Sequence, residues 1–196
     1  MSGPRGKPLR AFFALWPDDD VRRQLAERAA IAARQCGGRA PKPETLHLTL
    51  VFLGSTPMER VAALTAAMDR VDVPSFPLTF DRSGWFRQSG VAWLGVGRIP
   101  EPLVELQSSL ARSAGRMGFS LDVRPYVPHL TLARDIRKPL PDRVFAPVEW
   151  RVSSFALMAS ELLPDGPRYR IVHETPLRSD TAAGAAVEPA LTQGSP

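Results

Sequence analysis

Apolar runs alternate with helical patterns along the first part of the chain. Residues 10–16 (RAFFALW) form a short aromatic run that predicts a buried strand. Pro17 and the three aspartates behind it favour a helix start, because acidic side chains stabilise a first helical turn. Apolar residues at helical spacing continue this element until Gly37 and Gly38 end it. Residues 46–53 (LHLTLVFL) then predict a second strand.

The remaining elements are predicted in the same way. Thr56 followed by Pro57 and Glu59 is typical of a helix start with Thr56 as the N-cap, and this helix should run to about Val71. Further strands are expected at residues 76–80, 91–96, 126–134 and 169–177, one or two more within 148–162, a helix from Pro102 to 115–118, and a loop at 81–90.

Three helices among seven or eight strands, with strand–helix–strand units in both halves, predict an α+β fold. The segments FFALWP near the start and FALMASEL near the end echo each other. This echo is weak in itself, but joined to two HLTL strands at residues 47–50 and 129–132 it leads us to expect two pseudo-symmetric lobes of antiparallel sheet, with flanking helices, around a central groove. Residues 9–178 should form this single bilobal domain, with a flexible segment at 1–8 and a disordered tail at 179–196.

Composition narrows the class of protein. The chain has 196 residues, of which 44% are hydrophobic, enough to bury a core. A single cysteine, Cys36, excludes an intramolecular disulfide, and neither a signal peptide nor a membrane-spanning run is found. We expect a soluble cytoplasmic protein, and a monomer because a two-lobed groove needs no partner. The net charge of +5 favours a polyanion such as a nucleic acid as a partner, although an arginine-rich composition explains it equally well.

The tetrapeptide HLTL occurs twice, 82 positions apart. Because side chains alternate sides in a strand, His47 and Thr49 share one face while the leucines and Phe52 share the other. His129 and Thr131 share a face in the second copy. Any half-exposed strand alternates in this way, so the alternation alone does not establish chemistry. Two matched copies in a chain with three histidines instead indicate two halves of one site, facing each other across the groove.

Paired histidines suit acid–base catalysis. An imidazole titrates near pH 6.5, so one ring can be neutral and the other protonated around neutral pH. The neutral ring removes a proton from an attacking water or hydroxyl, and the cationic ring donates one to the leaving oxygen. Transfer at phosphorus to or from ribose oxygens needs such a pair and no metal. A threonine hydroxyl two residues along can donate a hydrogen bond to a non-bridging phosphate oxygen.

The two H-x-T-x motifs, together with RAFFALWP, TLHLTLVFLG, VAWLGV and RPYVPHLTLAR, closely resemble the 2H phosphoesterase superfamily. Within it, the chain resembles the RNA 2′,3′-cyclic phosphodiesterases, historically called 2′-5′ RNA ligases, over residues 9–177. The resemblance implies that His47 and His129 are catalytic and that Thr49 and Thr131 bind phosphate. It also implies that a terminal 2′,3′-cyclic phosphate of RNA is opened to a 2′-phosphomonoester, with reversible 2′-5′ ligation as the related activity.

The resemblance further implies that Arg134 contacts the phosphate or the substrate. Simple alternation puts Arg134 on the leucine face, so the strand must bulge or end near Ala133 for this side chain to reach the groove. We assign His47 as the donor to the leaving O3′ and His129 as the base, while the equivalence of the two motifs leaves the reverse assignment open.

Other aromatic and histidine residues have competing interpretations. Phe13 is our candidate for stacking on a base, although core packing is the alternative. Trp93 is expected in the core, while Trp85 and Phe86 could be exposed platforms or a hydrophobic cover. His173 lies in a third H-x-T pattern, HETP, but it lacks flanking leucines and is interpreted as a structural or surface residue.

The sequence contains no zinc-binding pattern of histidines or cysteines, no P-loop and no Rossmann glycine run. We therefore expect neither a metal nor another cofactor. The expected partners are RNA ends or nucleoside 2′,3′-cyclic phosphates, with no membrane and no obligate protein partner. Two alternatives stay open, namely an enzyme of this superfamily that acts on another small cyclic phosphate and a non-catalytic RNA-end-binding module.

Overall fold

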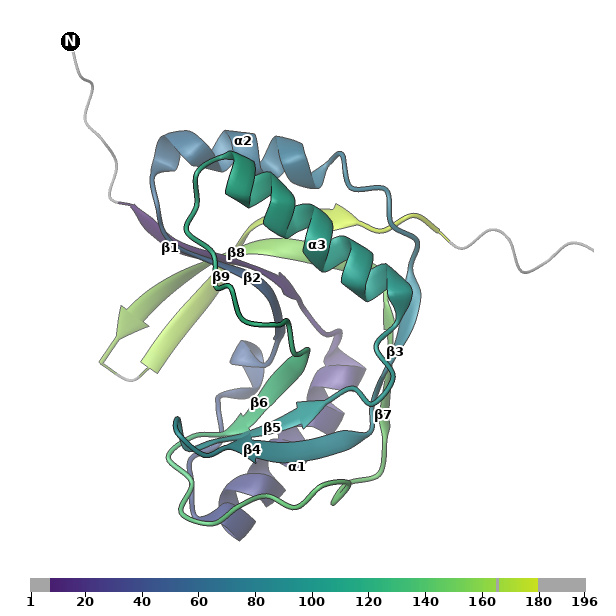
Figure 1. Ribbon diagram of the computed structural model, residues 1–196. Coiled ribbons are helices and arrows are strands. Elements are labelled where there is room, and N and C mark those ends of the chain that lie inside the picture. The colour runs from purple at the N-terminus through teal and green to yellow at the C-terminus, as the bar shows by residue number, and fades with distance from the viewer. Residues whose placement is uncertain (1–7, 165, 180–196) are drawn as a thin grey trace, which may run out of the picture.

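The computed structural model describes residues 8–164 and 166–179 (Figure 1). The predicted flexible segment and tail therefore lie almost entirely outside the described residues. In chain order the described elements are β1 (Leu9–Leu15), α1 (Asp19–Cys36), the 3₁₀ helix η1 (Pro43–Thr45), β2 (Leu48–Thr56), α2 (Met58–Met68), β3 (Phe76–Phe80), β4 (Arg82–Phe86), β5 (Val91–Gly95), α3 (Glu101–Arg116), β6 (His129–Ala133), β7 (Val148–Val152), β8 (Ser154–Leu163) and β9 (Gly166–Pro176).

The strands form one antiparallel sheet in the order β4-β5-β6-β2-β1-β8-β9 and a separate pair, β3 with β7. The sheet has a twofold plan about the contact between β6 and β2, because β1-α1-β2 on one side corresponds to β5-α3-β6 on the other. If the chain is divided at the turn between β4 and β5, each half of the sheet contains one strand from the other part of the chain. β4, from the first part, pairs with β5, and β8, from the second part, pairs with β1. The predicted α+β class with two similar lobes is confirmed.

The echo between FFALWP and FALMASEL does not follow this twofold plan. The two segments lie in β1 and β8, which are hydrogen-bonded neighbours, whereas the counterpart of β1 in the sheet order is β5. Only the HLTL repeat therefore reports the internal symmetry.

The helices also cross between the halves. Helix α1, which follows β1, packs on β6, while α3, which follows β5, packs on β2 and contacts α2 (Figure 1). Asp18 caps α1 by accepting a hydrogen bond of 2.9 Å from the Val21 amide, and Gly37 ends it in the left-handed conformation at φ 68°. The predicted start and stop of this helix are confirmed. No helix in the described ranges is long and apolar enough to cross a membrane.

The second helix begins differently from its prediction. Thr56 is the last residue of β2, and its hydroxyl donates back to the Gly54 carbonyl at 3.2 Å, so it does not cap α2. Pro57 occupies the N-cap position without a side-chain hydrogen bond, and the helix ends at Met68 rather than near Val71. A threonine that already has an acceptor two residues back in its own strand is unavailable as a cap.

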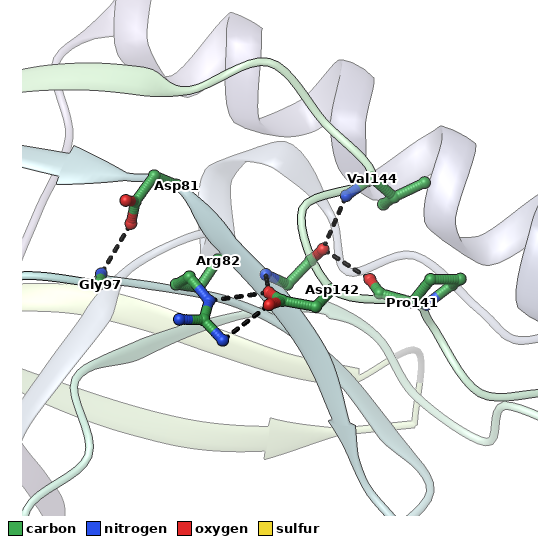
Figure 2. Close-up of polar contacts among 7 residues, drawn as sticks. Asp81, Arg82, Gly97, Pro141, Asp142 and Val144 are labelled. Atoms are coloured by element: carbon green, nitrogen blue, oxygen red, sulfur yellow. Dashed lines mark hydrogen bonds and ion pairs between the residues drawn. The ribbon is translucent and has the colours of Figure 1, made fainter.

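The loop predicted at 81–90 contains a strand, β4, and this part of the prediction was wrong. Pairing with β5 and side-chain hydrogen bonds from a distant connection stabilise it (Figure 2). The Asp142 carboxylate accepts from Arg82 Nε at 2.9 Å and from the Ser83 amide at 3.2 Å, and buried Ser83 donates to the Pro141 carbonyl at 2.7 Å. These partners lie about 60 positions away in sequence, so the local pattern could not reveal them.

Other strands differ in extent. β6 begins at His129 rather than at 126, and β2 begins at Leu48 rather than at 46. Residues 148–162 form two strands that are separated by Ser153. The described residues thus contain nine strands, against the seven or eight expected.

Candidate active site

The two HLTL segments meet at the centre of the sheet. The only ladder pair that joins β2 to β6 is Leu48 with Leu130, the residues that directly follow the two histidines. Both leucines are fully buried, so a slip of one residue in register would expose them and bury the polar residues instead. Continuing this antiparallel register by one position each way brings His47 beside Thr131 and Thr49 beside His129. One histidine and one threonine from each motif therefore surround one point of the surface.

Each motif is followed by a bulge that changes the face of the next side chains. On β2, Phe13 pairs with Val51 and Ala14 with Thr49, so Leu50 is the extra residue, and Phe52 turns to the His–Thr face with 48% exposure. The prediction that Phe52 shares the leucine face was wrong for this reason.

The second bulge explains how the Arg134 side chain reaches the groove. Across β6, Ala92 pairs with Ala133 and Trp93 with Thr131, which leaves Leu132 as the extra residue. Leu132 and Ala133 are both buried, and Arg134 is exposed on the cavity that both histidines line. The predicted bulge near Ala133 is confirmed. Phe52 and Arg134 therefore stand at equivalent positions, three residues beyond the threonine of each motif.

The segment after α1 holds the backbone of Arg134. The Arg39 amide donates to the Arg134 carbonyl at 2.8 Å, and the Arg134 amide donates to the Arg39 carbonyl at 2.9 Å. A Cβ on Gly38 would lie 2.5 Å from the Arg134 carbonyl oxygen, so only glycine allows this approach. Asp135 follows in the left-handed conformation at φ 56° and accepts a hydrogen bond from Arg39 Nε at 3.0 Å.

Both imidazoles are oriented by the same local contact. Nδ1 of His47 lies 2.7 Å from the Thr45 carbonyl, and Nδ1 of His129 lies 2.7 Å from the Val127 carbonyl. A carbonyl oxygen can only accept, so each Nδ1 carries a hydrogen and each Nε2 is left to exchange a proton with a substrate. In the unliganded site, Nε2 of His47 accepts from the Thr49 hydroxyl at 3.1 Å.

Aromatic rings surround His47. The ring centroids of Phe12, Trp16 and Tyr169 lie 4.9, 5.8 and 5.1 Å from that of His47. This burial, together with the positive charge of Arg134, lowers the pKa of His47 to about 4. His47 is therefore neutral around pH 7 in the unliganded protein.

His129 contacts one aromatic ring, that of Phe86 on β4, edge to face at 5.0 Å. Phe86 packs in turn on Trp93 at 5.7 Å, and the indole of Trp93 lies over Gly84 and Gly95, where a Cβ would come within 2.5 and 2.8 Å of it. Trp93 thus packs against the sheet half-buried, outside the hydrophobic core in which it was expected, and it lines neither of the cavities described next.

Two cavities meet at the paired motifs. The first, about 550 Å³, is lined by both histidines, both threonines and Arg134, and it extends along β1 and β8 to Arg10 and Ser160. The second, about 1000 Å³, contains Trp85 and Phe86 among its lining residues. The residues common to the two cavities are Thr49, Phe52, His129, Thr131 and Arg134. Among residues 8–164 and 166–179, no cluster of three His, Cys, Asp or Glu side chains is placed to hold a metal ion.

The sequence signature of the 2′-5′ RNA ligase superfamily matches residues 17–162 of this chain, a span that contains both motifs. The chain belongs to the 2′-5′ RNA ligase superfamily. An RNA 2′,3′-cyclic phosphodiesterase of Escherichia coli K12 is 34% identical over 174 residues, which are 88% of this chain and 96% of that protein. One from Thermotoga maritima is 30% identical over 178 residues, 85% of this chain and 94% of its own length.

Solved structures of this superfamily have the same fold. E. coli LigT in its apo form superposes with a TM-score of 0.81 at 33% identity, and covers 88% of this chain and 99% of its own. LigT complexed with 3′-AMP gives a TM-score of 0.80 at 34% identity, over 87% and 99% of the two chains.

One residue that was predicted to line the site, Phe13, lies elsewhere. Phe13 is 1% exposed and packs in the main core, so the prediction that it reaches the groove was wrong. Its neighbour Phe12 lines the cavity instead and contacts His47. Two adjacent phenylalanines point to opposite faces, and the pattern of β1 alone does not tell which face meets the groove.

The third histidine, which was expected to be structural or at the surface, makes a structural contact. Nε2 of His173 lies 2.7 Å from the Asp69 carboxylate at the end of α2, and the Thr175 hydroxyl donates to the same carboxylate at 3.2 Å. The hydrogen bond from His173 holds the pKa of Asp69 below its usual range. This contact ties β9 to α2 and lies outside both cavities.

Sequence reasoning missed three residues of the site. Tyr169 and Trp16 enclose His47, and Tyr126 donates from its hydroxyl to the Thr49 carbonyl at 3.2 Å. None of them belongs to an H-x-T-x motif, and the alternation of a strand gives only a face. A signal existed for Trp16 and Tyr126, which lie within RAFFALWP and RPYVPHLTLAR, two segments that carry the resemblance.

Proposed function

We propose that the protein hydrolyses the terminal 2′,3′-cyclic phosphate of RNA to a 2′-phosphomonoester by metal-independent acid–base catalysis. The observation that carries this proposal is the pair of imidazoles, each anchored through Nδ1 to a carbonyl two residues back, with both rings lining one cavity. Relatives that are 34% and 30% identical are named RNA 2′,3′-cyclic phosphodiesterases, which supports this choice of substrate.

In the proposed reaction, the basic imidazole removes a proton from water while the water oxygen bonds to phosphorus. The P–O3′ bond breaks, and the other imidazole gives its proton to O3′, so the phosphate stays on O2′. Thr49 and Thr131 lie beside the reacting phosphorus and donate hydrogen bonds to its non-bridging oxygens. Arg134 adds positive charge against the negative charge that builds up there. The same ring opening, with a 5′-hydroxyl attacking the cyclic phosphate in place of water and O3′ leaving as before, gives a 2′-5′ phosphodiester and is the corresponding ligation.

We retain His47 as the acid and His129 as the base. The pKa of about 4 belongs to an unliganded site in which Arg134 and the surrounding rings disfavour the imidazolium. A bound phosphate anion neutralises Arg134 and offers His47 an ion pair, and both effects favour its protonated form. The Thr49 hydroxyl, which now donates to Nε2 of His47, then turns to the phosphate.

The test is turnover of a panel of cyclic phosphates, with the product identified by phosphorus NMR. The expected product of a nucleoside 2′,3′-cyclic phosphate is the 2′-monophosphate, formed equally well in EDTA. A 3′-phosphate product would contradict the proposed regiochemistry. Preference for a different cyclic phosphate, such as ADP-ribose 1″,2″-cyclic phosphate, would favour the alternative enzyme, and binding without turnover would favour an RNA-end-binding module.

Substitutions separate the roles within the site. His47→Ala and His129→Ala should each lower kcat by orders of magnitude, because neither proton transfer has a replacement. Thr49→Ala and Thr131→Ala should each cost about 2–4 kcal/mol of transition-state stabilisation if each hydroxyl supplies one donor. Full activity in either histidine variant would rule out the paired mechanism.

We also propose that the protein acts as a cytoplasmic monomer, since the groove is built from a single chain. Light scattering on the eluting protein over a hundredfold range of concentration should give one mass close to 21.5 kDa. A dimer that persists on dilution would contradict it.

A further inference from the structure

A second cation lies at the far end of the first cavity. The guanidinium of Arg10 sits 5.2 Å from the ring centroid of Phe52, and Arg10 is exposed on the cavity surface. In the described part of the chain Arg10 has no carboxylate partner. A ring held against a guanidinium fixes its direction without neutralising its charge. Arg10 is therefore an oriented cation that is available to an anion from outside.

The twofold plan of the sheet explains why a cation is found here. Phe52 stands three residues beyond Thr49, where the second motif has Arg134 three residues beyond Thr131. The first motif thus has the ring of Phe52 where the second motif has the charge of Arg134. The guanidinium of Arg10 lies over that ring. Each motif is therefore associated with one arginine, the second directly with Arg134 and the first with Arg10 through the ring of Phe52.

Arg10 is too far along the sheet to serve the reacting phosphate. On β1, Ala14 pairs with Thr49, and Arg10 lies four residues further on, which is about 13 Å along a strand. Tyr169 pairs with Ser160, which in turn pairs with Arg10. The charges of Arg10 and Arg134 both oppose the rise in the pKa of Tyr169 that burial causes, so its phenol lies near both cations.

The cavity that leads to Arg10 suits a strand of phosphates better than the second one does. Arg39 also lines the first cavity, where it is paired with Asp135. In the second cavity Arg124 makes a close ion pair with Asp122, a residue of the same wall, and Arg87 is exposed there without a ring to orient it among the described residues. An RNA that ends in a cyclic phosphate continues in one direction only, and the guanidinium that Phe52 orients favours the direction of Arg10.

We propose that Arg10, oriented by Phe52, binds a backbone phosphodiester on the 5′ side of the terminal nucleotide, so that the enzyme prefers oligonucleotide ends to mononucleotides. The assignment rests on the proposed function. It adds a subsite that a nucleoside cyclic phosphate leaves unused and an RNA strand fills.

The test compares adenosine 2′,3′-cyclic phosphate with an RNA trinucleotide that ends in the same group. In Arg10→Ala, the ratio of kcat/KM for the trinucleotide to kcat/KM for the mononucleotide should fall about tenfold. The logarithmic salt dependence for the trinucleotide should become shallower by about 0.7, the value for one lost contact to a single strand. Arg70→Ala is the matched control: it removes the same charge from an exposed site outside the cavities and should leave the ratio unchanged. Phe52→Leu should lower the ratio by a smaller factor.

Equal losses on both substrates in Arg10→Ala, or an unchanged ratio and salt dependence, would overturn the inference. The same comparison in binding separates it from the proposed function. Calorimetry with adenosine 2′-monophosphate and with a trinucleotide that ends in a 2′-phosphate should show the loss in Arg10→Ala for the trinucleotide. If wild-type protein turns over neither cyclic substrate, the proposed function fails, and selective loss of trinucleotide binding would still support the subsite.

Discussion

The protonation of His47 depends on whether an anion occupies the site. Three aromatic rings remove water from the imidazole, and Arg134 adds like charge, so the pKa falls to about 4. An anion between the two histidines offsets both causes, because it neutralises Arg134 and forms an ion pair with the imidazolium. The arrangement keeps the imidazole uncharged until a phosphate arrives, which links protonation of His47 to occupancy of the site.

We expect that link to be measurable by NMR. The ring resonances of His47 should titrate near pH 4 in the free protein and at least one pH unit higher with saturating adenosine 2′-monophosphate. Phe12→Leu should narrow the gap by raising the free value, because less of the imidazole is desolvated. The same titration point with and without ligand would contradict the acid role of His47.

The repeated motif residues of the site could be predicted from the sequence, but the residues that pack around them could not. The HLTL pair, the two histidines and the bulge before Arg134 follow from the sequence because they are local patterns. The choice of Phe12 over Phe13, the rings around His47 and the donor for Thr49 depend on which face of β1, β9 or β6 meets the groove. β1 pairs with β8 more than a hundred positions away, and Tyr126 lies 77 positions from Thr49. No local period records either contact.

At the level of elements, the turn after α1 does two tasks with two glycines. Gly37 ends the helix at φ 68°, while Gly38 lets the chain approach the Arg134 carbonyl closely enough for the two hydrogen bonds with Arg39. This contact at the end of β6 sets where Arg134 leaves the sheet. The end of a helix in one half of the chain therefore positions a cation that follows the motif of the other half.

Gly38→Ala should consequently impair catalysis more than folding. The new methyl group would force the Arg134 carbonyl away by several tenths of an ångström or more, and kcat/KM should fall about tenfold or more. The thermal midpoint should drop by a few degrees only, since the contact lies at the surface. Gly115→Ala, on α3 where nothing lies within 4 Å of the added Cβ, is the matched control and should keep full activity. Equal losses of activity in the two variants would show that the Gly38 contact is not specific.

The strand that the sequence did not reveal, β4, is fixed by contacts from a distant part of the chain. β4 pairs with β5, and its Arg82 and Ser83 are held by Asp142, about 60 positions away (Figure 2). A reading from local periodicity succeeds for α1, α3 and β1, which carry strong patterns of their own, and fails where a strand exists through its partner.

β4 and β8 each complete the half of the sheet that belongs to the other part of the chain. The fold therefore resembles an intertwined dimer in which the two subunits are joined at the turn of the β4–β5 hairpin. Neither part of the chain contains all the strands of its half of the sheet, so we expect neither part to be stable without the other. If the chain is cut between Gln88 and Ser89, neither fragment should show a cooperative thermal transition alone. An equimolar mixture should recover the transition and the phosphodiesterase activity together. A fragment that melts cooperatively by itself would show that one lobe is autonomous. Reconstitution would mean that the catalytic pair is assembled at an internal subunit boundary, with one histidine contributed from each side.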